Sequence, residues 1–111
     1  MSVMEKNKID GMGIDEKTNT LVFLLVDHLP WIIEEYNHLK TLQAKLNSYL
    51  AYIETKQYKS VYRNREFDKF RIEIAFKYQF TENCEKFLGA VRAELKTHNI
   101  ELKYSVVQND N

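Results

Sequence analysis

The residue types in this chain that could do chemistry are few, and the first group lies between positions 27 and 38. Asp27, His28 and His38 carry side chains that bind metals or transfer protons. If this segment is helical, the two histidines differ by roughly 80° around the axis and roughly 15 Å along it. They then cannot share one metal ion at bond lengths of about 2 Å unless the chain bends back sharply. A metal-dependent hydrolase is therefore the least favoured function.

The other candidate metal-binding or acid–base residues are explained more simply by structural roles. Glu35 and His38, and likewise Glu94 and His98, have the spacing of neighbours on a helix surface. A carboxylate-bridged metal pair would need further carboxylates from facing helices. The sequence has no glycine-rich phosphate loop, nucleophile elbow or H-E-x-x-H run. We therefore predict no metal, no cofactor and no catalytic residues, and nothing in the sequence argues for an enzyme.

Cys84 is the single cysteine of the chain. A thiol near a helix N-terminus can have a lowered pKa and become reactive. Cys84 also falls in line with Leu88 and Leu95, which predicts a buried apolar role instead. One cysteine cannot form an intramolecular disulfide, which favours a reducing, cytoplasmic location.

The segment 57–71 alternates basic and aromatic side chains. Such interleaving can serve stacking on single-stranded nucleic acid, and Arg with Tyr is also typical of protein interfaces. A third interpretation is a connection whose aromatic rings cover the end of a long helix. With Trp31 added from the strand–helix junction, the candidate interaction surface comprises Trp31, Tyr58, Tyr62, Arg63, Arg65 and Lys69.

Size and charge limit the alternatives. At 111 residues the chain has the length of a single domain, 1–111, with ends 1–7 and 108–111 expected to be flexible. Sixteen basic and sixteen acidic residues cancel, which gives nucleic-acid or membrane attraction no support. The longest apolar run, 21–26, is far too short to span a membrane.

The elements that must position these residues follow from hydrophobic periodicity. Segments 8–14 and 20–26 read as strands, the second apolar on both faces as in a strand buried on both sides or centrally placed. A helix then begins with Asp27 as N-cap or at Pro30 and runs to about 56. Its buried stripe comprises Ile32, Tyr36, Leu39, Leu42, Leu46, Leu50 and Ile53. Its solvent-facing residues are Lys40, Lys45, Asn47 and Glu54.

The second half of the chain repeats the pattern. Segment 71–80 alternates strictly, as a strand with one wet face does. Thr81 is the expected N-cap of a second helix, Asn99 the left-handed residue after it, and 100–106 the last strand. We predict an α+β two-layer sandwich of order ββαβαβ, with two helices on one face of a four-stranded mixed or antiparallel sheet. Some 25 helical residues, roughly 37 Å, would overhang strands of roughly 20 Å, so the segment 56–69 or a second copy should cover the overhang.

The sequence resembles that of a family of small bacterial proteins of unknown function. The resemblance covers about 9–107 and is most specific over 27–54, from Asp27-His28-Leu29 and Trp31 through His38-Leu39 to Ile53-Glu54. Ile9-Asp10 matches the start of the pattern. Thr55 and Lys56 stand where the family has glycine, and the following loop lacks its proline, so 57–69 transfers least. The resemblance implies the fold and brings no activity with it.

The function predicted from the sequence is protein binding. We expect a non-enzymatic bacterial interaction domain, of immunity or accessory type, that binds a partner protein or itself as a homodimer. The alternative is single-stranded nucleic-acid binding through 57–71, which zero net charge makes less favoured. No membrane partner is expected.

Overall fold

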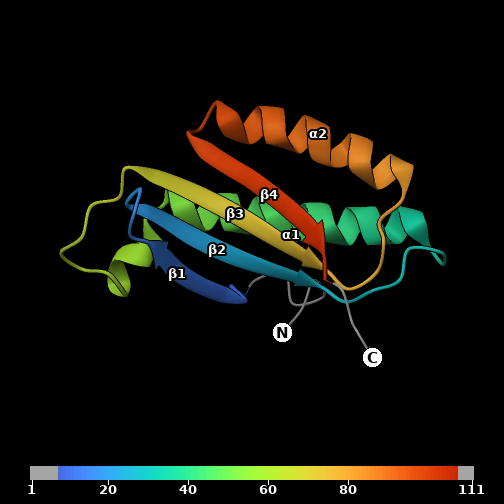
Figure 1. Cartoon of the computed structure of the whole chain (residues 1–111), viewed down its shortest axis with the longest axis horizontal. Helices are drawn as coiled ribbons and strands as arrows, with labels where there is room; N and C mark the ends of the chain where they lie inside the picture. The colour runs from blue at the N-terminus through green and yellow to red at the C-terminus, as the bar shows by residue number, and fades with distance from the viewer. Residues whose placement is uncertain (1–7, 108–111) are drawn as a thin grey trace.

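The computed structural model describes residues 8–107. The first half of the chain forms β1 (Gly11–Asp15), β2 (Thr20–Asp27), α1 (Glu35–Glu54) and the short 3-10 helix η1 (Gln57–Ser60). The second half forms β3 (Lys69–Phe76), α2 (Glu82–Lys96) and β4 (Ile100–Val106) (Figure 1). The segments 1–7 and 108–111, predicted to be flexible, lie outside the described residues.

The predicted fold class is confirmed. The sheet has the order β1-β2-β3-β4, with β1 antiparallel to β2 and the other two pairs parallel. A short turn suffices for the antiparallel hairpin, whereas each parallel pair needs a crossover, which α1 and α2 provide. Figure 1 shows α1 behind the sheet and α2 running alongside β4. The result is a two-layer α+β fold with a mixed sheet.

The core lies between the helices and one face of the sheet. Alternate residues of the three parallel strands point into it, because side chains alternate across a strand. They are Leu21, Phe23, Leu25, Ile72, Ile74, Phe76, Ile100 and Leu102. On the opposite face Leu24 is 38% exposed, so the expectation that β2 is buried on both sides is wrong, although its central position is right.

The start of α1 differs most from the sequence prediction. The helix begins at Glu35, after Glu34 in the left-handed region at φ 57°, and neither Asp27 nor Leu29 caps it. The Asp27 carboxylate instead accepts the backbone N–H of Leu29 at 3.1 Å and contacts His38. This tertiary contact holds 28–34 as a loop. Consequently Ile32 and Tyr36, predicted in the buried stripe, are 94% and 71% exposed.

The shorter helix reduces the predicted overhang, although the first turns of α1 still extend past the ends of the strands in Figure 1. Twenty helical residues reach roughly 30 Å, close to the roughly 26 Å of the eight-residue β2. At its C-terminal end the chain turns through Lys56 in the left-handed region and enters η1, whose Tyr58 is 6% exposed. The segment after α1 therefore joins the core at this end of the helix.

The two ends of α2 follow local sequence signals more closely than the start of α1 does. The Thr81 hydroxyl accepts the Cys84 N–H at 3.1 Å, and Asn99 has φ 62°, both as predicted. Strand β3 ends at Phe76 rather than near position 80. Its neighbours β2 and β4 also stop there, Phe76 lying opposite Asp27 and Val106, so no partner remains to extend the ladder.

Candidate functional site

Asp27 and His38 form a buried acid–histidine pair where β2 ends. Both Asp27 oxygens lie close to His38 Nε2, at 2.8 and 2.6 Å, and the residues are 0% and 4% exposed. Asp27 is the last residue of β2, and His38 lies in the first turns of α1. The bend over 28–34 brings them together. His28 is exposed on that loop, so the two histidines remain apart.

Trp31 covers this pair rather than contributing to the surface. Its ring stacks on the His38 ring with centroids 3.4 Å apart and planes 12° apart, and it is 3% exposed. Within the part of the chain that the structure describes, Trp31 Nε1 and His38 Nδ1 have no hydrogen-bond partner. The sequence analysis placed Trp31 on an interaction surface, and the structure corrects this. Trp31 is a core residue that holds the loop 28–34 against His38.

A second buried polar group joins the chain before β1 to the middle of α1. Lys45 Nζ lies 2.8 Å from Asp10 Oδ1, and the side chains are 0% and 3% exposed. The other Asp10 oxygen accepts the Val26 N–H at 2.8 Å. The Tyr49 hydroxyl accepts the Asp10 N–H at 3.0 Å and donates to the Leu24 carbonyl at 2.6 Å. Burial, the largest cause, raises the pKa of Tyr49, so the phenol stays protonated.

The sequence prediction put Lys45 in water, and that placement is wrong. The buried positions of α1 are His38, Leu42, Lys45, Leu46, Tyr49 and Ile53. Their steps of three and four residues are those of one helix face, so Lys45 was on the buried stripe by spacing. Its charge, however, favoured a position in water. The tertiary contact with Asp10 helps to make burial of the ammonium tolerable.

These groups act as structural anchors. Asp27 contacts His38 and accepts the Leu29 N–H, while Asp10 engages Lys45 and Val26. Cys84, 0% exposed as predicted, has its pKa raised to about 12 by burial first and then by the negative charge of Asp27. Its thiol therefore stays protonated at neutral pH. The Asp27–His38 and Asp10–Lys45 pairs can therefore fix the loop 28–34 and the start of β1.

The aromatic residues of 57–71 pack on one another. Tyr58 and Phe70 lie 5.2 Å apart, and Tyr62 and Phe67 meet edge to face at 5.6 Å. Arg65 donates to Glu16 at 2.9 Å and to Asn19 at 3.0 Å, with its guanidinium over the Phe67 ring. The six residues predicted as one interaction surface differ in burial: Trp31 and Tyr58 are buried, Tyr62 and Arg65 are partly buried, and Arg63 and Lys69 are exposed.

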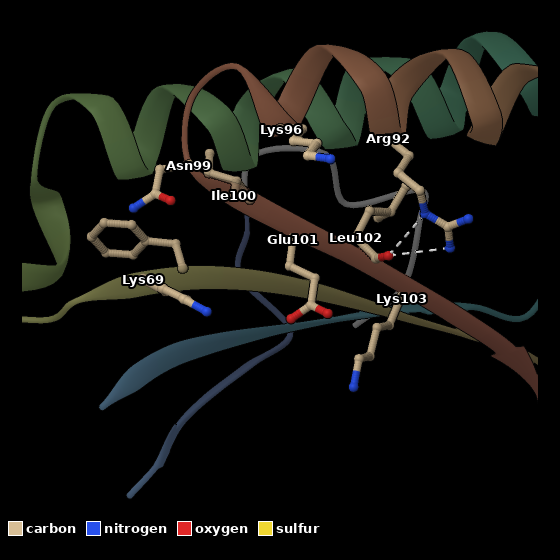
Figure 2. A pocket seen from close by; sticks show the side chains of 9 residues that line it. Lys69, Arg92, Lys96, Asn99, Ile100, Glu101, Leu102 and Lys103 are labelled. Carbon is tan, nitrogen blue, oxygen red and sulfur yellow. Dashed lines mark hydrogen bonds between the residues drawn. The ribbon is translucent and has the colours of Figure 1, made fainter. Parts of the chain in front are cut away.

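Lys69 borders a cavity of about 500 Å³ along the free edge of β4 (Figure 2). The cavity is lined from three elements. They contribute Lys69 and Phe70 from β3, Arg92 and Lys96 from α2, Asn99 from the turn, and 100–103 from β4. Sequence reasoning placed none of these together apart from Lys69 and Phe70, because β3, α2 and β4 meet only in the folded sheet.

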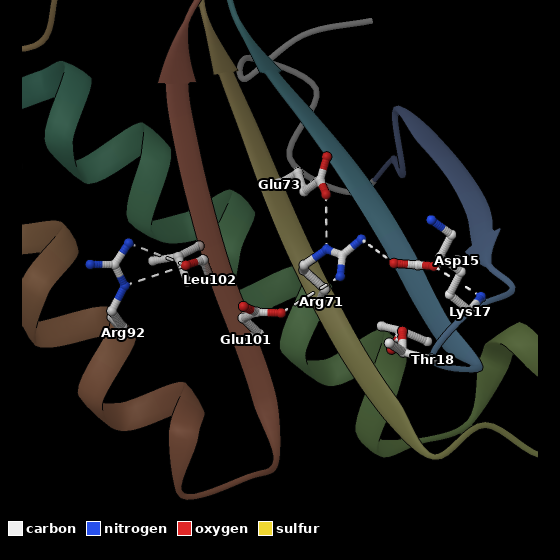
Figure 3. A network of polar contacts seen from close by, with 9 residues as sticks. Asp15, Lys17, Thr18, Arg71, Glu73, Arg92, Glu101 and Leu102 are labelled. Atoms are coloured by element: carbon white, nitrogen blue, oxygen red, sulfur yellow. Dashed lines mark hydrogen bonds and ion pairs between the residues drawn. The ribbon is translucent and has the colours of Figure 1, made fainter.

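On the uncovered face of the sheet, Arg71 joins three strands (Figure 3). Its guanidinium nitrogens lie 3.2 Å from Asp15, 2.8 Å from Glu73 and 3.6 Å from Glu101. The hydrogen bond from Arg71 lowers the pKa of Asp15. Arg71, one of the basic residues of segment 57–71, is thus neutralised by three carboxylates.

Three exposed apolar side chains lie where the loop 28–34 meets the first turn of α1. Ile32 is 94% exposed, Ile33 69% and Tyr36 71%, within five consecutive positions. We refer to Ile32, Ile33 and Tyr36 as the loop patch. No local sequence signal separates these residues from a buried stripe, because their spacing continues that of α1.

Fold and site together define a class: a two-layer α+β domain with a buried acid–histidine anchor and an exposed apolar loop. The chain belongs to the family of unknown function DUF6572, whose model matches residues 1–108, as the resemblance to an uncharacterised family implied. No curated protein and no solved structure matches it. Over residues 8–107, no helix has the length and apolar character to cross a membrane, and no three His, Cys, Asp or Glu side chains are grouped to hold a metal.

Proposed function

We propose that this protein is a non-enzymatic interaction domain that binds another protein through the loop patch of Ile32, Ile33 and Tyr36. The observation that carries the proposal is the exposure of two adjacent isoleucines, 94% and 69%, on a loop held by buried contacts. Single exposed apolar residues are ordinary on protein surfaces, whereas a group of them favours an interaction site.

The anchoring of the loop supports this proposal. Asp27, His38 and Trp31 are buried beneath it and fix its two ends through hydrogen bonds and ring stacking. A loop held in one conformation loses little entropy when a partner binds, so more of the contact energy appears as affinity. The buried pair thus has a positioning role in the proposal, in place of an acid–base role.

The proposed occupant is a different protein, with an immunity-type or accessory role as the finer form of the proposal. Three side chains offer a small apolar area, whereas stable homodimers bury far larger and more continuous surfaces. A transient contact with a partner that supplies a complementary apolar pocket fits this size. The proposal keeps the cytoplasmic location that a single buried cysteine favours.

Binding of single-stranded nucleic acid gains no support from the 57–71 segment. Tyr58, Phe67 and Phe70 contact one another at centroid distances of 5.2 to 6.4 Å. Rings packed in this way leave few open faces for base stacking. This alternative has no specific observation in its favour.

The test is affinity capture with three immobilised proteins: wild type, Ile33→Asp and Val61→Asp. Val61 is also an exposed apolar residue, at 58%, but it lies in the connection between α1 and β3, so it is a matched control. We expect a protein retained by wild type and Val61→Asp and lost from Ile33→Asp. A partner that binds all three equally, or none that binds any, would remove the loop patch as the binding surface.

A further inference from the structure

The cavity along the free edge of β4 has the properties of a ligand site. Its volume of about 500 Å³ lies within the roughly 300–1,000 Å³ usual for small-molecule pockets. Half-buried Phe70 and the buried side chains of Ile100 and Leu102 line its apolar part. It lies at the end where β3 and β4 begin, whereas the loop patch follows the end of β2, so the two sites are separate.

The lining is strongly positive although the whole chain is neutral. The lining carries four cations and one carboxylate: Arg92 and Lys96 lie on the α2 side of β4, and Lys69, Lys103 and Glu101 lie on the other side (Figure 2). Together they leave a surplus of three positive charges on a chain with formal net charge zero. Within residues 8–107, the three lysines form no ion pair. Glu101 is itself engaged by Arg71 at 3.6 Å. The local field therefore favours an anion.

Arg92 is held in position for such an anion. Its Nε and Nη2 both donate to the Leu102 carbonyl at 3.3 Å, and its guanidinium lies 4.8 Å from the Tyr104 ring centroid. Figure 2 shows Arg92 and Lys96 extending from α2 toward β4 on the same side of the strand. The remaining guanidinium N–H groups can bind an oxyanion with little loss of side-chain entropy.

The same contact argues against a peptide strand as the ligand. Addition of a strand to β4 would need the outward carbonyl of Leu102, which Arg92 already occupies. Lysines on a sheet edge do prevent unwanted strand pairing, and Lys96 suits the C-terminal turn of α2. Those roles explain individual cations. They do not require a cavity with an apolar lining between them.

We propose that this cavity binds a small phosphate-bearing ligand with an apolar or aromatic moiety. The phosphate oxygens contact Arg92 and Lys96, and the apolar moiety packs on Phe70. Lys69 and Lys103, which point to the other side of β4 in Figure 2, add long-range attraction. Affinity then falls as salt concentration rises.

The test is titration of the isotope-labelled full chain by NMR with pyrophosphate, a nucleoside diphosphate and the uncharged nucleoside. We expect amide shifts confined to 69–70 and 92–103, with the nucleoside diphosphate binding more tightly than pyrophosphate and the nucleoside weakest. Lys96→Gln should weaken binding about fivefold or more. Lys86→Gln, on the same helix but outside the cavity, should change it less than about twofold.

Several results would overturn the proposal. One is the absence of shifts in 92–103 with either phosphate probe at about 10 mM, a concentration beyond any specific affinity. Equal loss of affinity in Lys86→Gln and Lys96→Gln would show non-specific charge attraction. Binding of a single-stranded oligonucleotide without binding of either small probe would replace the pocket with an extended nucleic-acid surface.

Discussion

At the residue scale, the chemistry-bearing side chains of this protein hold structure in place. Asp27 and His38 could have been a general acid–base pair, yet Trp31 covers the imidazole ring at 3.4 Å and both carboxylate oxygens contact its Nε2. Burial of such a pair is expensive unless each group is satisfied by the other. The two residues therefore depend on each other, and on the loop they close.

Replacing His38 should destabilise the fold sharply. His38→Ala leaves the Asp27 carboxylate buried at 0% exposure without its ring partner, so we expect a loss of about 3–5 kcal/mol in the free energy of unfolding. His28→Ala, on the exposed part of the loop, should change it by less than about 0.5 kcal/mol. Urea unfolding of both variants at pH 7 measures the difference, and equal losses would contradict a buried anchor.

Cys84 should be inert in the native state and should link stability to alkaline pH. Burial raises its pKa from 9.0 to about 12, so the fold favours the protonated thiol. Its contribution to stability is full below pH 9 and is lost as the pH rises from 9 toward 12. Native protein at pH 8 should react slowly with a thiol reagent and quickly in urea. Cys84→Ser should flatten the alkaline loss, and rapid labelling of the native protein would refute the buried assignment.

At the element scale, helix boundaries divide into those set by local capping and those set by distant contacts. The N-cap of α2 is local: the Thr81 hydroxyl accepts the Cys84 N–H at 3.1 Å. The start of α1 is not, because Glu34 has no side-chain cap and the helix begins where the Asp27–His38 contact allows. Local sequence rules predicted the first and failed on the second.

Removing the α2 cap should cost a measurable amount of stability. Thr81→Ala leaves the Cys84 N–H without its acceptor, so we expect a loss of about 1 kcal/mol and faster hydrogen exchange in the first turn of α2. Thr97→Ala, at the other end of the helix, removes only an exposed bond to the Glu94 carbonyl and should cost less. Equal exchange rates in the first turn of wild type and Thr81→Ala would show that the cap is not needed.

The Arg71 network should contribute to stability above acidic pH. The pKa of Asp15 is lowered chiefly by the Arg71 hydrogen bond, so its stabilising effect exists above the unfolded value near 3.8 and disappears as pH falls through the lower folded value. Arg71→Met should therefore weaken the fold at pH 7 more than at pH 2. Arg63→Met, at an exposed position, provides the control. A constant difference between wild type and Arg71→Met across this range would contradict the linkage.

At the scale of the whole molecule, two exposed surfaces lie apart on the fold. The loop patch is apolar and follows the end of β2. The cavity along the free edge of β4 is basic and lies where β3 and β4 begin. Neither depends on the other, so a variant in one should leave binding at the other unchanged. This separation distinguishes failure of the protein-binding proposal from failure of the phosphate-ligand proposal.

The size of the loop patch predicts a monomer in isolation. We expect light scattering to give a mass near 13.3 kDa, because three side chains provide much less than the roughly 800 Å² per partner of a typical stable interface. Ile33→Asp should leave that mass and the unfolding free energy unchanged within about 0.5 kcal/mol. A dimer that dissociates in Ile33→Asp, but persists in Val61→Asp, would make a second copy the occupant of the patch.

The sequence by itself determined the order of elements, the fold class and the cap of α2, because alternation, helical spacing and Thr81 act through neighbouring residues. Tertiary structure decided which charged residues are buried. Lys45 and Asp10 lie 35 positions apart, and no local pattern reports their pairing at 2.8 Å. It also decided that Ile32 faces water while Trp31 does not, since the segment predicted as helix forms a loop held by the contacts of Asp27 and Trp31 with His38. Periodicity encodes faces of elements; long-range electrostatics and packing decide where those elements begin.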